Sequence, residues 1–540
     1  MTTSGWRRSL MRRGGGSLIA VALSLGLLQT PVAAQGGNRI SGEVVDEAGA
    51  PVQAAFVTLR EARVGVAFTA YTNPAGRYSL GGVPPGVYEA TARHAQLGRE
   101  VRGELAYDGG GASWDFSLRG GADRYGSGAT FLNVIPDSDE KRRFMLDCTN
   151  CHVFNERIAF PGDHARSIRA WDEAMTRMVS KFGSSTRFPI ISEHRNPDRH
   201  SVWIASSMTG YPSSAPPLPP VPFELAGVML TEYELPAELD LPHDLKVDSR
   251  GQVVITGQHT GRMYVLNPES GAFRQVSIPV RRANPRALDI GPDGRWWVAL
   301  GDPELLAGFD PVTGAWQTFP IGSYPHSLQV DGMGSIWFNG HFTVDPEIIG
   351  SLDSETGKVT AYEVPPQTGD SVEQNTVPYG LRVAPDGKVW GTELRGNRLL
   401  RVDPGTGDVD TWTLPEPYSG PRRLDIGADG TVWIPEYAGG RLLRFDPSDE
   451  SFTAYDLPLK DALPYVVRVD QQRGMVWIGT GAADAILAFQ PAREHFTIFP
   501  LPTRGALIRH IDIVEEAGEV WASYSASPGV PSKILRIRLP

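Results

Sequence analysis

The sequence predicts a mainly β protein in which a β-sandwich and a small all-α domain precede a seven-bladed β-propeller. A motif recurs seven times in the C-terminal part, about every 43 residues with one interval of 53 residues, as expected of propeller blades. Near the start, apolar and polar residues alternate between turns, as in antiparallel strands. Between these regions, apolar residues recur at helical spacing. The predicted order is 1–34 signal peptide, 35–122 β-sandwich, 123–210 helical domain, 211–226 Pro-rich linker and 227–540 propeller.

The first 34 residues have the pattern of a secretory signal. Arg7, Arg8, Arg12 and Arg13 precede the apolar run "SLIAVALSLGLL" (17–28), and "PVAA" (31–34) supplies small residues for cleavage. We expect cleavage after Ala34 and a periplasmic or otherwise exported protein, with an uncleaved anchor as the alternative. The formal net charge of −11 argues against nucleic acid as a partner.

Two stretches of the next module read as strands joined by turns. They are "ISGEVVDEAGAPVQAAFVTL" (40–59) and "YTNPAGRYSLGGVPPGVYEATA" (71–92). The pattern of Gly, Pro and Tyr residues in these stretches resembles that of the carboxypeptidase regulatory-like domain, which implies a non-catalytic sandwich. A spacer or adhesion role follows from this resemblance, with glycan binding as the alternative.

The stretch "CTNCH" (148–152) holds both cysteines of the chain. No second Cys pair is present for a structural zinc site, and no strand pattern precedes the motif as in a thioredoxin-like site. A C-x-x-C-H motif places two thiols where they can form thioethers with haem, and the adjacent imidazole can ligate its iron. We therefore predict covalent haem c on Cys148 and Cys151 with His152 as axial ligand. The alternative is a surface disulfide.

The segment "SIRAWDEAMTRMVSKFG" (167–183) predicts a helix with an apolar face that could pack against haem or form an ordinary core. Together with the haem motif, its Trp171 and the Arg-Met pair ending in Met178 resemble small cytochrome c domains of some periplasmic quinohaemoproteins, over about residues 140–205. The resemblance implies Met178 as the second axial ligand, with Met175 as the second choice.

Seven stretches in the C-terminal part share an opening strand and a turn. They start at residues 242, 285, 325, 378, 421, 464 and 508, and "PYGLRVAPDGKVW" (378–390) is typical. Each copy holds four short strands, except that the last one stops one strand early at "SKILRIRLP" (532–540). The spare strand "GVMLTEYELP" (227–236) is expected to complete the last blade and close the ring.

This repeat resembles the streptogramin (virginiamycin B) lyase family. The resemblance implies a site that holds Mg²⁺ and removes a proton to open a cyclic ester. His326 and Glu393 match two of the family's site residues, but Tyr379 stands where the family has the His of a Glu-Pro-His sequence. A tyrosine is a poor base at neutral pH, so Mg²⁺ chemistry is the less favoured interpretation.

The residue after each blade-opening Pro should line one mouth of the channel, with Glu393 and Glu436 behind it. These residues form a ring of imidazole, guanidinium and phenol groups: His243, Arg286, His326, Tyr379, Arg422 and Tyr465. Arginines at a mouth favour an anionic small molecule. The alternative is that these side chains only stabilise the channel.

Taken together, these patterns favour an exported haem protein that transfers electrons in connection with ligand or substrate binding at the propeller mouth. A redox partner protein in the periplasm is then expected. If the chain is an enzyme, a haem-linked oxidoreductase is favoured over a Mg²⁺-dependent carbon–oxygen lyase. A non-enzymatic binding or sensing protein of the cell envelope is the further alternative.

Overall fold

A computed structural model of the chain describes residues 39–539 except 62, 122–125, 151, 211, 213–224, 226, 238–239, 343–345, 368–375 and 526–530. The predicted signal peptide lies outside the described residues, as does most of the predicted linker. Within the described part, strands predominate and α-helices are confined to residues 128–207. None of the described helices has the length and apolar character that a membrane crossing needs.

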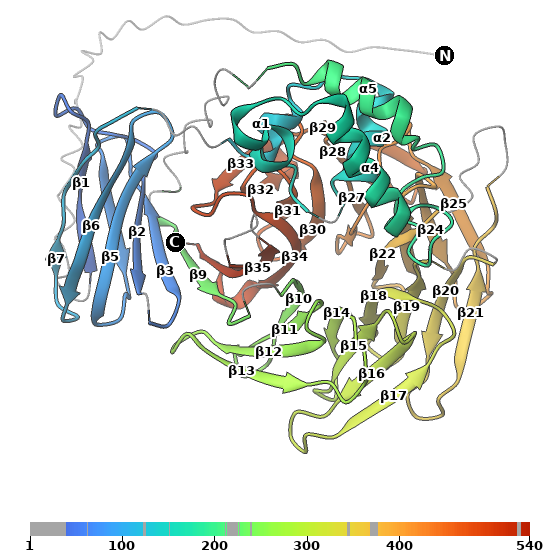
Figure 1. Ribbon diagram of the computed structural model, residues 1–540. Helices are drawn as coiled ribbons and strands as arrows, with labels where there is room; N and C mark the ends of the chain where they lie inside the picture. The colour runs from blue at the N-terminus through green and yellow to red at the C-terminus, as the bar shows by residue number, and fades with distance from the viewer. Residues whose placement is uncertain are drawn as a thin grey trace, which may run out of the picture.

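The N-terminal module is a small sandwich of β-strands, drawn in blue in Figure 1. One sheet contains β1 (Arg39–Val45), β4 (Arg77–Gly81), β7 (Ala112–Ser113) and β8 (Phe116–Ser117). The facing strands are β2 (Phe56–Glu61), β3 (Val66–Tyr71), β5 (Gly86–His94) and β6 (Gly98–Tyr107). Their alternate residues fill one core, including Val44, Leu59 and Tyr88. The predicted β-sandwich is confirmed.

Six blades are four-stranded antiparallel sheets formed by consecutive strands. Blade one comprises β10 (Pro242–Val247), β11 (Val253–Gly257), β12 (Arg262–Asn267) and β13 (Ala272–Ser277). Blade two comprises β14 (Pro285–Ile290), β15 (Trp296–Leu300), β16 (Leu305–Phe309) and β17 (Trp316–Pro320). Blade three comprises β18 (Pro325–Val330), β19 (Ile336–Gly340), β20 (Ile348–Leu352) and β21 (Val359–Glu363). Blade four comprises β22 (Pro378–Val383), β23 (Val389–Glu393), β24 (Arg398–Val402) and β25 (Val409–Thr413). Blade five comprises β26 (Asp425–Ile426), β27 (Val432–Glu436), β28 (Arg441–Asp446) and β29 (Ser451–Asp456). Blade six comprises β30 (Pro464–Asp470), β31 (Met475–Thr480), β32 (Ala485–Gln490) and β33 (His495–Pro500).

The last blade is completed from the front of the propeller. Its strands β34 (Leu507–Val514), β35 (Glu519–Ser525) and β36 (Lys533–Arg538) are followed by β9 (Met229–Glu234), which pairs with β36 along its whole length. The predicted seven-blade closure is therefore confirmed.

Most blades repeat the same turn glycine and the same packing of a following tryptophan. The hairpin after the innermost strand turns at a glycine with positive φ, such as Gly387 at +84°, a conformation that costs other residues more. A tryptophan often follows, and Trp390 packs with Leu424 and Ile434 of the next blade. The core therefore lies between successive blades, and the innermost strands line a central channel.

The β-sandwich is joined to the propeller by strand pairing, which the sequence did not indicate. Strand β3 pairs antiparallel with β9, so the sandwich sheet and the last blade form one eight-stranded sheet. Arg60 forms a bidentate ion pair with Glu234 across this junction, and the Tyr71 hydroxyl donates to the Pro500 carbonyl at 2.7 Å. The free edge expected on β9 is thus covered by the sandwich.

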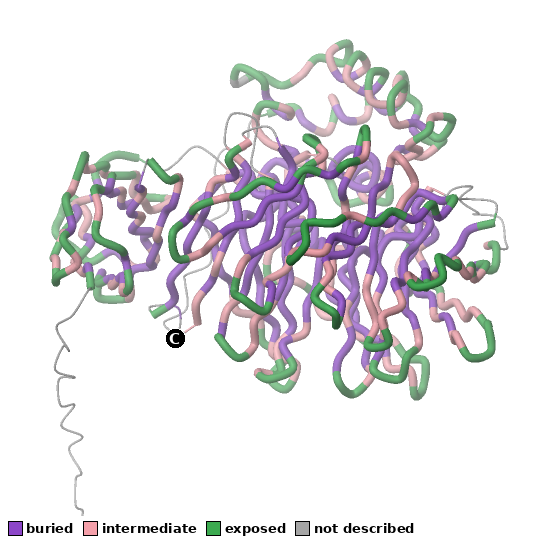
Figure 2. The backbone as a smooth tube through the Cα atoms, turned by 90° about the horizontal axis from the view of Figure 1, so that it is seen from below, coloured by how far each residue is buried: buried purple, intermediate pink, exposed green. Residues whose placement is uncertain are grey.

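Helices occupy residues 128–207 and form a layer over one face of the propeller (Figure 2). They are α1 (Gly128–Leu132), α2 (Asp139–Cys148), α3 (Glu156–Ala159), α4 (Ile168–Phe182) and α5 (Pro197–Ser207), with 3₁₀ turns at η1 (Pro161–Asp163) here and at η3 (Pro491–Arg493) and η4 (Glu515–Ala517) in the blades. The helix expected over 167–183 is confirmed as α4, with Ser167 capping its first turn. That this helical module has a cytochrome c fold stays a prediction.

Candidate functional site

A mostly apolar cavity of about 330 Å³ opens within the helical module. Its lining includes the sequence-predicted Cys148, His152, Met175 and Met178. The other lining residues are Phe144, Phe154, Ile158, Arg166, Trp171, Ala174, Arg177, Lys181 and Phe182. The structure therefore brings the described part of the C-x-x-C-H motif and both candidate methionines to one cavity.

Helix α2 ends at Cys148, so the helix geometry fixes where this thiol enters the cavity. Burial raises the pKa of Cys148 to about 12, which opposes a role as a free thiolate in redox switching. Burial lowers the pKa of His152, so its half-buried imidazole is neutral at pH 7 and able to ligate a metal. Cys151 lies outside the described residues.

Helix α4 supplies the methionines and part of the cationic rim. Met175 is buried and Met178 is half-buried, one helical turn apart. Arg166, Arg177 and Lys181 also line the cavity, whereas its described lining has no carboxylate. An apolar space with three cations at its boundary suits a flat apolar molecule that carries negative groups.

The two residues between the cysteines contact the propeller. Arg422 donates to the Asn150 side chain, and Arg509 donates to the Asn150 carbonyl at 3.4 Å. The Tyr437 hydroxyl donates to the Thr149 carbonyl at 2.8 Å. The turn Thr149–Asn150 therefore covers the channel mouth at blades five and seven, and we call this end the covered mouth.

A buried ion-pair network holds this turn in place. Asp147 accepts from Arg195 of the helical module at 2.8 Å and from Arg395 of the propeller at 2.6 Å. The Asp147 side chain is 1 % exposed, and the arginines keep its pKa low although burial alone would raise it. One carboxylate thus links the residue before the C-x-x-C-H motif to blade four.

The predicted ring at the channel mouth largely assembles. His326 lies 5.3 Å from His243 and 4.3 Å from Tyr379 between ring centroids. Arg422 stacks over Tyr465 at 4.3 Å. Arg286 lies at the edge of this ring, over Tyr324 at 5.2 Å. These groups are mostly buried, and burial lowers the pKa of His243 to about 3, so its imidazole is neutral.

Tyr379 and Tyr465 share a hydrogen bond at the centre of the ring. Arg422 donates to the Tyr379 hydroxyl at 2.8 Å, and Arg509 donates to the Tyr465 hydroxyl at 3.0 Å. Burial acts to raise the pKa of Tyr465, but Arg509, Arg422 and Arg423 outweigh it and lower the pKa to about 8. Burial raises the pKa of Tyr379. Tyr465 is thus the member of the pair that loses its proton first.

The two predicted glutamates are turned away from the ring into ion pairs. Both carboxylate oxygens of Glu393 accept from the Arg398 guanidinium, one from Nε and one from Nη2, each at 2.5 Å. Glu436 pairs with Arg441 at 2.6 Å and accepts from Ser419 at 2.6 Å. Within the part of the chain that the structure describes, no group of three or more His, Cys, Asp or Glu residues could hold a metal ion.

Sequence reasoning missed a second inward-facing position in several blades. A β-bulge follows the opening Pro of several innermost strands, so two consecutive residues face the channel there. Asp244, next to His243, accepts from Arg423 at 2.9 Å and lies 3.5 Å from His510. Strict alternation of inward-facing and outward-facing residues predicts only one such residue per strand. The charged residues two places after the opening Pro, Asp244 and Arg423, would have been a usable signal for the second inward-facing position.

The comparisons with known proteins support two of the three modules. Residues 39–119 match the model of the carboxypeptidase regulatory-like domain, and residues 369–530 match that of the virginiamycin B lyase family. A search of curated proteins gave no match to the chain.

Three similar solved structures share the propeller fold. Virginiamycin B lyase from Staphylococcus aureus aligns with a TM-score of 0.51 and 21 % identity, over 58 % of this chain and all of that chain. Its catalytically inactive variant with quinupristin gives the same values. A streptogramin B lyase aligns equally well, over 58 % of this chain and 98 % of that chain. At this identity the likeness shows the fold alone. The chain therefore carries a carboxypeptidase regulatory-like domain and a virginiamycin B lyase-like propeller.

Proposed function

We propose that this chain is an exported c-type haem protein that transfers electrons, with its haem in the cavity of the helical module. The observation that carries the proposal is the convergence of Cys148, His152 and Met178 on one apolar cavity with a cationic boundary. Its donor set fits haem, because thiol, imidazole and thioether groups meet where apolar side chains and cations line the space. The predicted signal peptide supports export, since c-type haem is attached outside the cytoplasm.

In this proposal, Cys148 and Cys151 would attach the group, and His152 and Met178 would ligate its iron. Bound haem would supply a one-electron couple. Arg166, Arg177 and Lys181 would pair with its carboxylates, and Phe154 and Trp171 would exclude water from its face. A thioether ligand raises the reduction potential of such a couple. The redox partner is expected to be another exported protein.

Visible spectra and redox titration of the exported protein test this proposal. The wild type should give a haemochrome spectrum in pyridine, and the haem should stay with the denatured polypeptide because it would be covalently held. Met178→Ala should retain the haem but have a lower reduction potential, and the matched variant Met175→Ala should keep the wild-type potential. A colourless wild type would contradict the proposal, and a lower potential only in Met175→Ala would reassign the ligand.

The second candidate is a carbon–oxygen lyase or a ligand-binding propeller. The match of residues 369–530 to the virginiamycin B lyase family favours it. Against lyase chemistry, Glu393 is engaged by Arg398, Tyr379 by Arg422, and the turn with Asn150 covers the mouth. Ring opening of quinupristin with Mg²⁺, measured with and without EDTA, tests this function. We expect no turnover, and an EDTA-sensitive reaction abolished in His326→Ala would establish the second candidate instead.

A further inference from the structure

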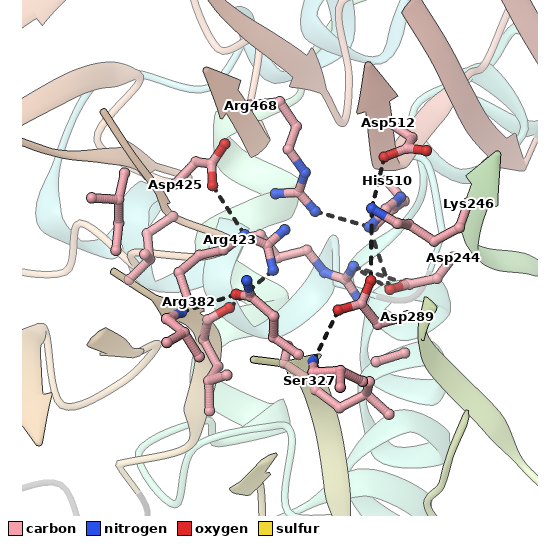
Figure 3. A pocket seen from close by; sticks show the side chains of 18 of the residues that line it. Asp244, Lys246, Asp289, Ser327, Arg382, Arg423, Asp425, Arg468, His510 and Asp512 are labelled. Carbon is pink, nitrogen blue, oxygen red and sulfur yellow. Dashed lines mark hydrogen bonds and ion pairs between the residues drawn. The ribbon is translucent and has the colours of Figure 1, made fainter. Parts of the chain in front are cut away.

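The opposite end of the channel is open and contains a second, polar cavity of about 560 Å³ (Figure 3). It is lined by the C-terminal halves of the innermost strands, whereas the helical module contacts the residues at their N-terminal ends. We call this end the open mouth. The predicted ring does not reach this end, and the haem proposal makes no use of it.

The fifth residue of each of the seven repeats, which start at 242, 285, 325, 378, 421, 464 and 508, lines the open mouth. These residues alternate in charge around much of the ring: Lys246, Asp289, Gln329, Arg382, Asp425, Arg468 and Asp512. The lysine and arginines of this ring equal its aspartates in number. The cavity is also lined by Arg423 and by Asp244, Asp331 and Glu515, so its carboxylates outnumber its cations and binding of an anion depends on which of them are already paired.

The acceptors of this ring are already engaged. Asp289, Asp425 and Asp512 each accept a backbone N–H of the next blade, at 2.8 to 2.9 Å. Asp512 also accepts from Lys246 at 3.0 Å, and Asp425 accepts from Arg382 at 3.0 Å. Because the carboxylates serve the blade-to-blade contacts, they are poorly placed to neutralise a further cation.

Arg468 is the cation of this ring that forms no direct ion pair, although Asp425 and Asp512 lie close enough to attract its charge. It is 8 % exposed, and among the described residues its guanidinium forms no ion pair. It donates only to neutral groups, to the Val467 carbonyl and to His510 Nε2, both at 2.9 Å. Burial, and then repulsion by Arg382, lowers the pKa of Arg468 to about 9. A buried guanidinium in this state is stabilised by an anion that reaches it.

Further donors face the same cavity. Arg382 uses its Nε and Nη1 atoms within the protein, and its Nη2 atom makes no hydrogen bond to the described residues. The Gln329 side chain accepts from Val383 N through its oxygen, and its amide nitrogen likewise makes no such bond. The cavity therefore offers N–H groups of Arg382 and Gln329 to a ligand, in addition to Arg468.

We propose that the open mouth binds a small organic carboxylate, whose charged end pairs with Arg468 and receives further hydrogen bonds from Arg382 and Gln329. A planar carboxylate matches the fork of a guanidinium. The three aspartates of the ring repel a dianion such as phosphate more strongly than a monocarboxylate. The cavity volume lies in the range of small-molecule sites, so the rest of the ligand extends along the polar ring toward solvent.

Calorimetric titration of the full mature protein tests this proposal with gluconate, with sorbitol as its uncharged analogue, and with inorganic phosphate. Gluconate should bind more tightly than phosphate, and sorbitol should not bind. Arg468→Gln should weaken gluconate binding at least about tenfold, because a charge-assisted pair is lost. Arg444→Gln removes the same charge from the outer part of blade five and should change the affinity less than about twofold.

Three outcomes would overturn the proposal. They are absence of gluconate binding, binding of sorbitol or phosphate as tight as that of gluconate, and wild-type affinity in folded Arg468→Gln. If Arg468→Gln does not fold, Arg382→Gln replaces it and should also weaken binding severalfold, while the wild-type comparison of gluconate with sorbitol stays decisive. The test does not depend on haem, so its failure and the failure of the proposed function are separate results.

Discussion

The two ends of the propeller channel are built from the same seven strands but differ in how their buried charges are satisfied. At the covered mouth, Arg422 and Arg509 donate to phenols and to Asn150 of the helical module. At the open mouth, carboxylates bind the next blade's backbone, and Arg468 has only neutral partners. The same repeat thus produces one end completed by the chain itself and one end that an external ligand can complete.

The difference between the two ends also indicates which buried charges stabilise the fold and which are available for binding a ligand. A charge that a neighbouring module satisfies contributes to the attachment of that module. A charge that no module satisfies remains available to a ligand. Substitutions at the covered mouth should therefore change stability, and substitutions at the open mouth should mainly change binding.

The largest effect is expected from Asp147→Ala. This substitution leaves Arg195 and Arg395 buried without their shared carboxylate and should lower the free energy of unfolding of the helical module by about 3–5 kcal/mol. Urea denaturation followed by tryptophan fluorescence measures it. Asp198→Ala, at an exposed position of α5, should cost less than about 1 kcal/mol. Equal losses in the two variants would show that the network does not hold the module.

Asn150→Ala should have the next largest effect. It removes the acceptor of the Arg422 guanidinium and should destabilise the covered mouth by about 1.5–3 kcal/mol. The same denaturation experiment measures it, with Ser206→Ala on the exposed side of α5 as control. A stability equal to that of the control would mean that the turn merely lies near the mouth.

Tyr465 should give the covered mouth a pH dependence that is visible in tyrosinate absorption. Its pKa of about 8 lies below that of an unfolded tyrosine, about 10. Between these values the unfolded chain binds the proton and the folded protein does not. The free energy of unfolding should therefore rise with pH from 8 to 10, by on the order of 2 kcal/mol at most.

Ultraviolet absorption of tyrosinate measures this titration directly. One tyrosine should titrate near pH 8 in the wild type, and Tyr465→Phe should abolish that step. Tyr455→Phe, in the outer strand β29, should leave it in place. Persistence of the step in Tyr465→Phe would assign it to another residue.

The smallest effect is expected from Asp289→Asn at the open mouth. The amide oxygen can still accept from Val330 N, and the lost attraction to Lys246 acts over 3.7 Å in a solvated cavity. The free energy of unfolding should fall by less than about 1 kcal/mol, measured in urea. A loss as large as that of Asp147→Ala would remove the distinction between the two ends.

The blades were predictable because each repeat carries its own local signals. The opening Pro, the turn glycine and the following Trp recur together, so strand order and ring closure by β9 could be read from the sequence. The pairing of β9 with β3 could not, because it depends on two edges that meet only in the folded chain.

The candidate sites were predictable in part. The motif at 148–152 indicated chemistry at Cys148 and His152, but nothing in it signalled that Thr149 and Asn150 contact the propeller. The predicted mouth residues do come together, whereas Glu393 is withdrawn by Arg398, a partner five residues away on the next strand. The inward-facing Asp244 was missed because a bulge interrupts the alternation on which the prediction relied.

The most direct test of the central claim is the intact mass of the mature protein, purified from the periplasm of a host that attaches haem and measured under denaturing conditions. Our account predicts that the wild-type mass exceeds the polypeptide mass by one haem, and that the increment is absent when Cys148 and Cys151 are both replaced by Ala. A wild-type mass equal to that of the polypeptide alone would contradict it.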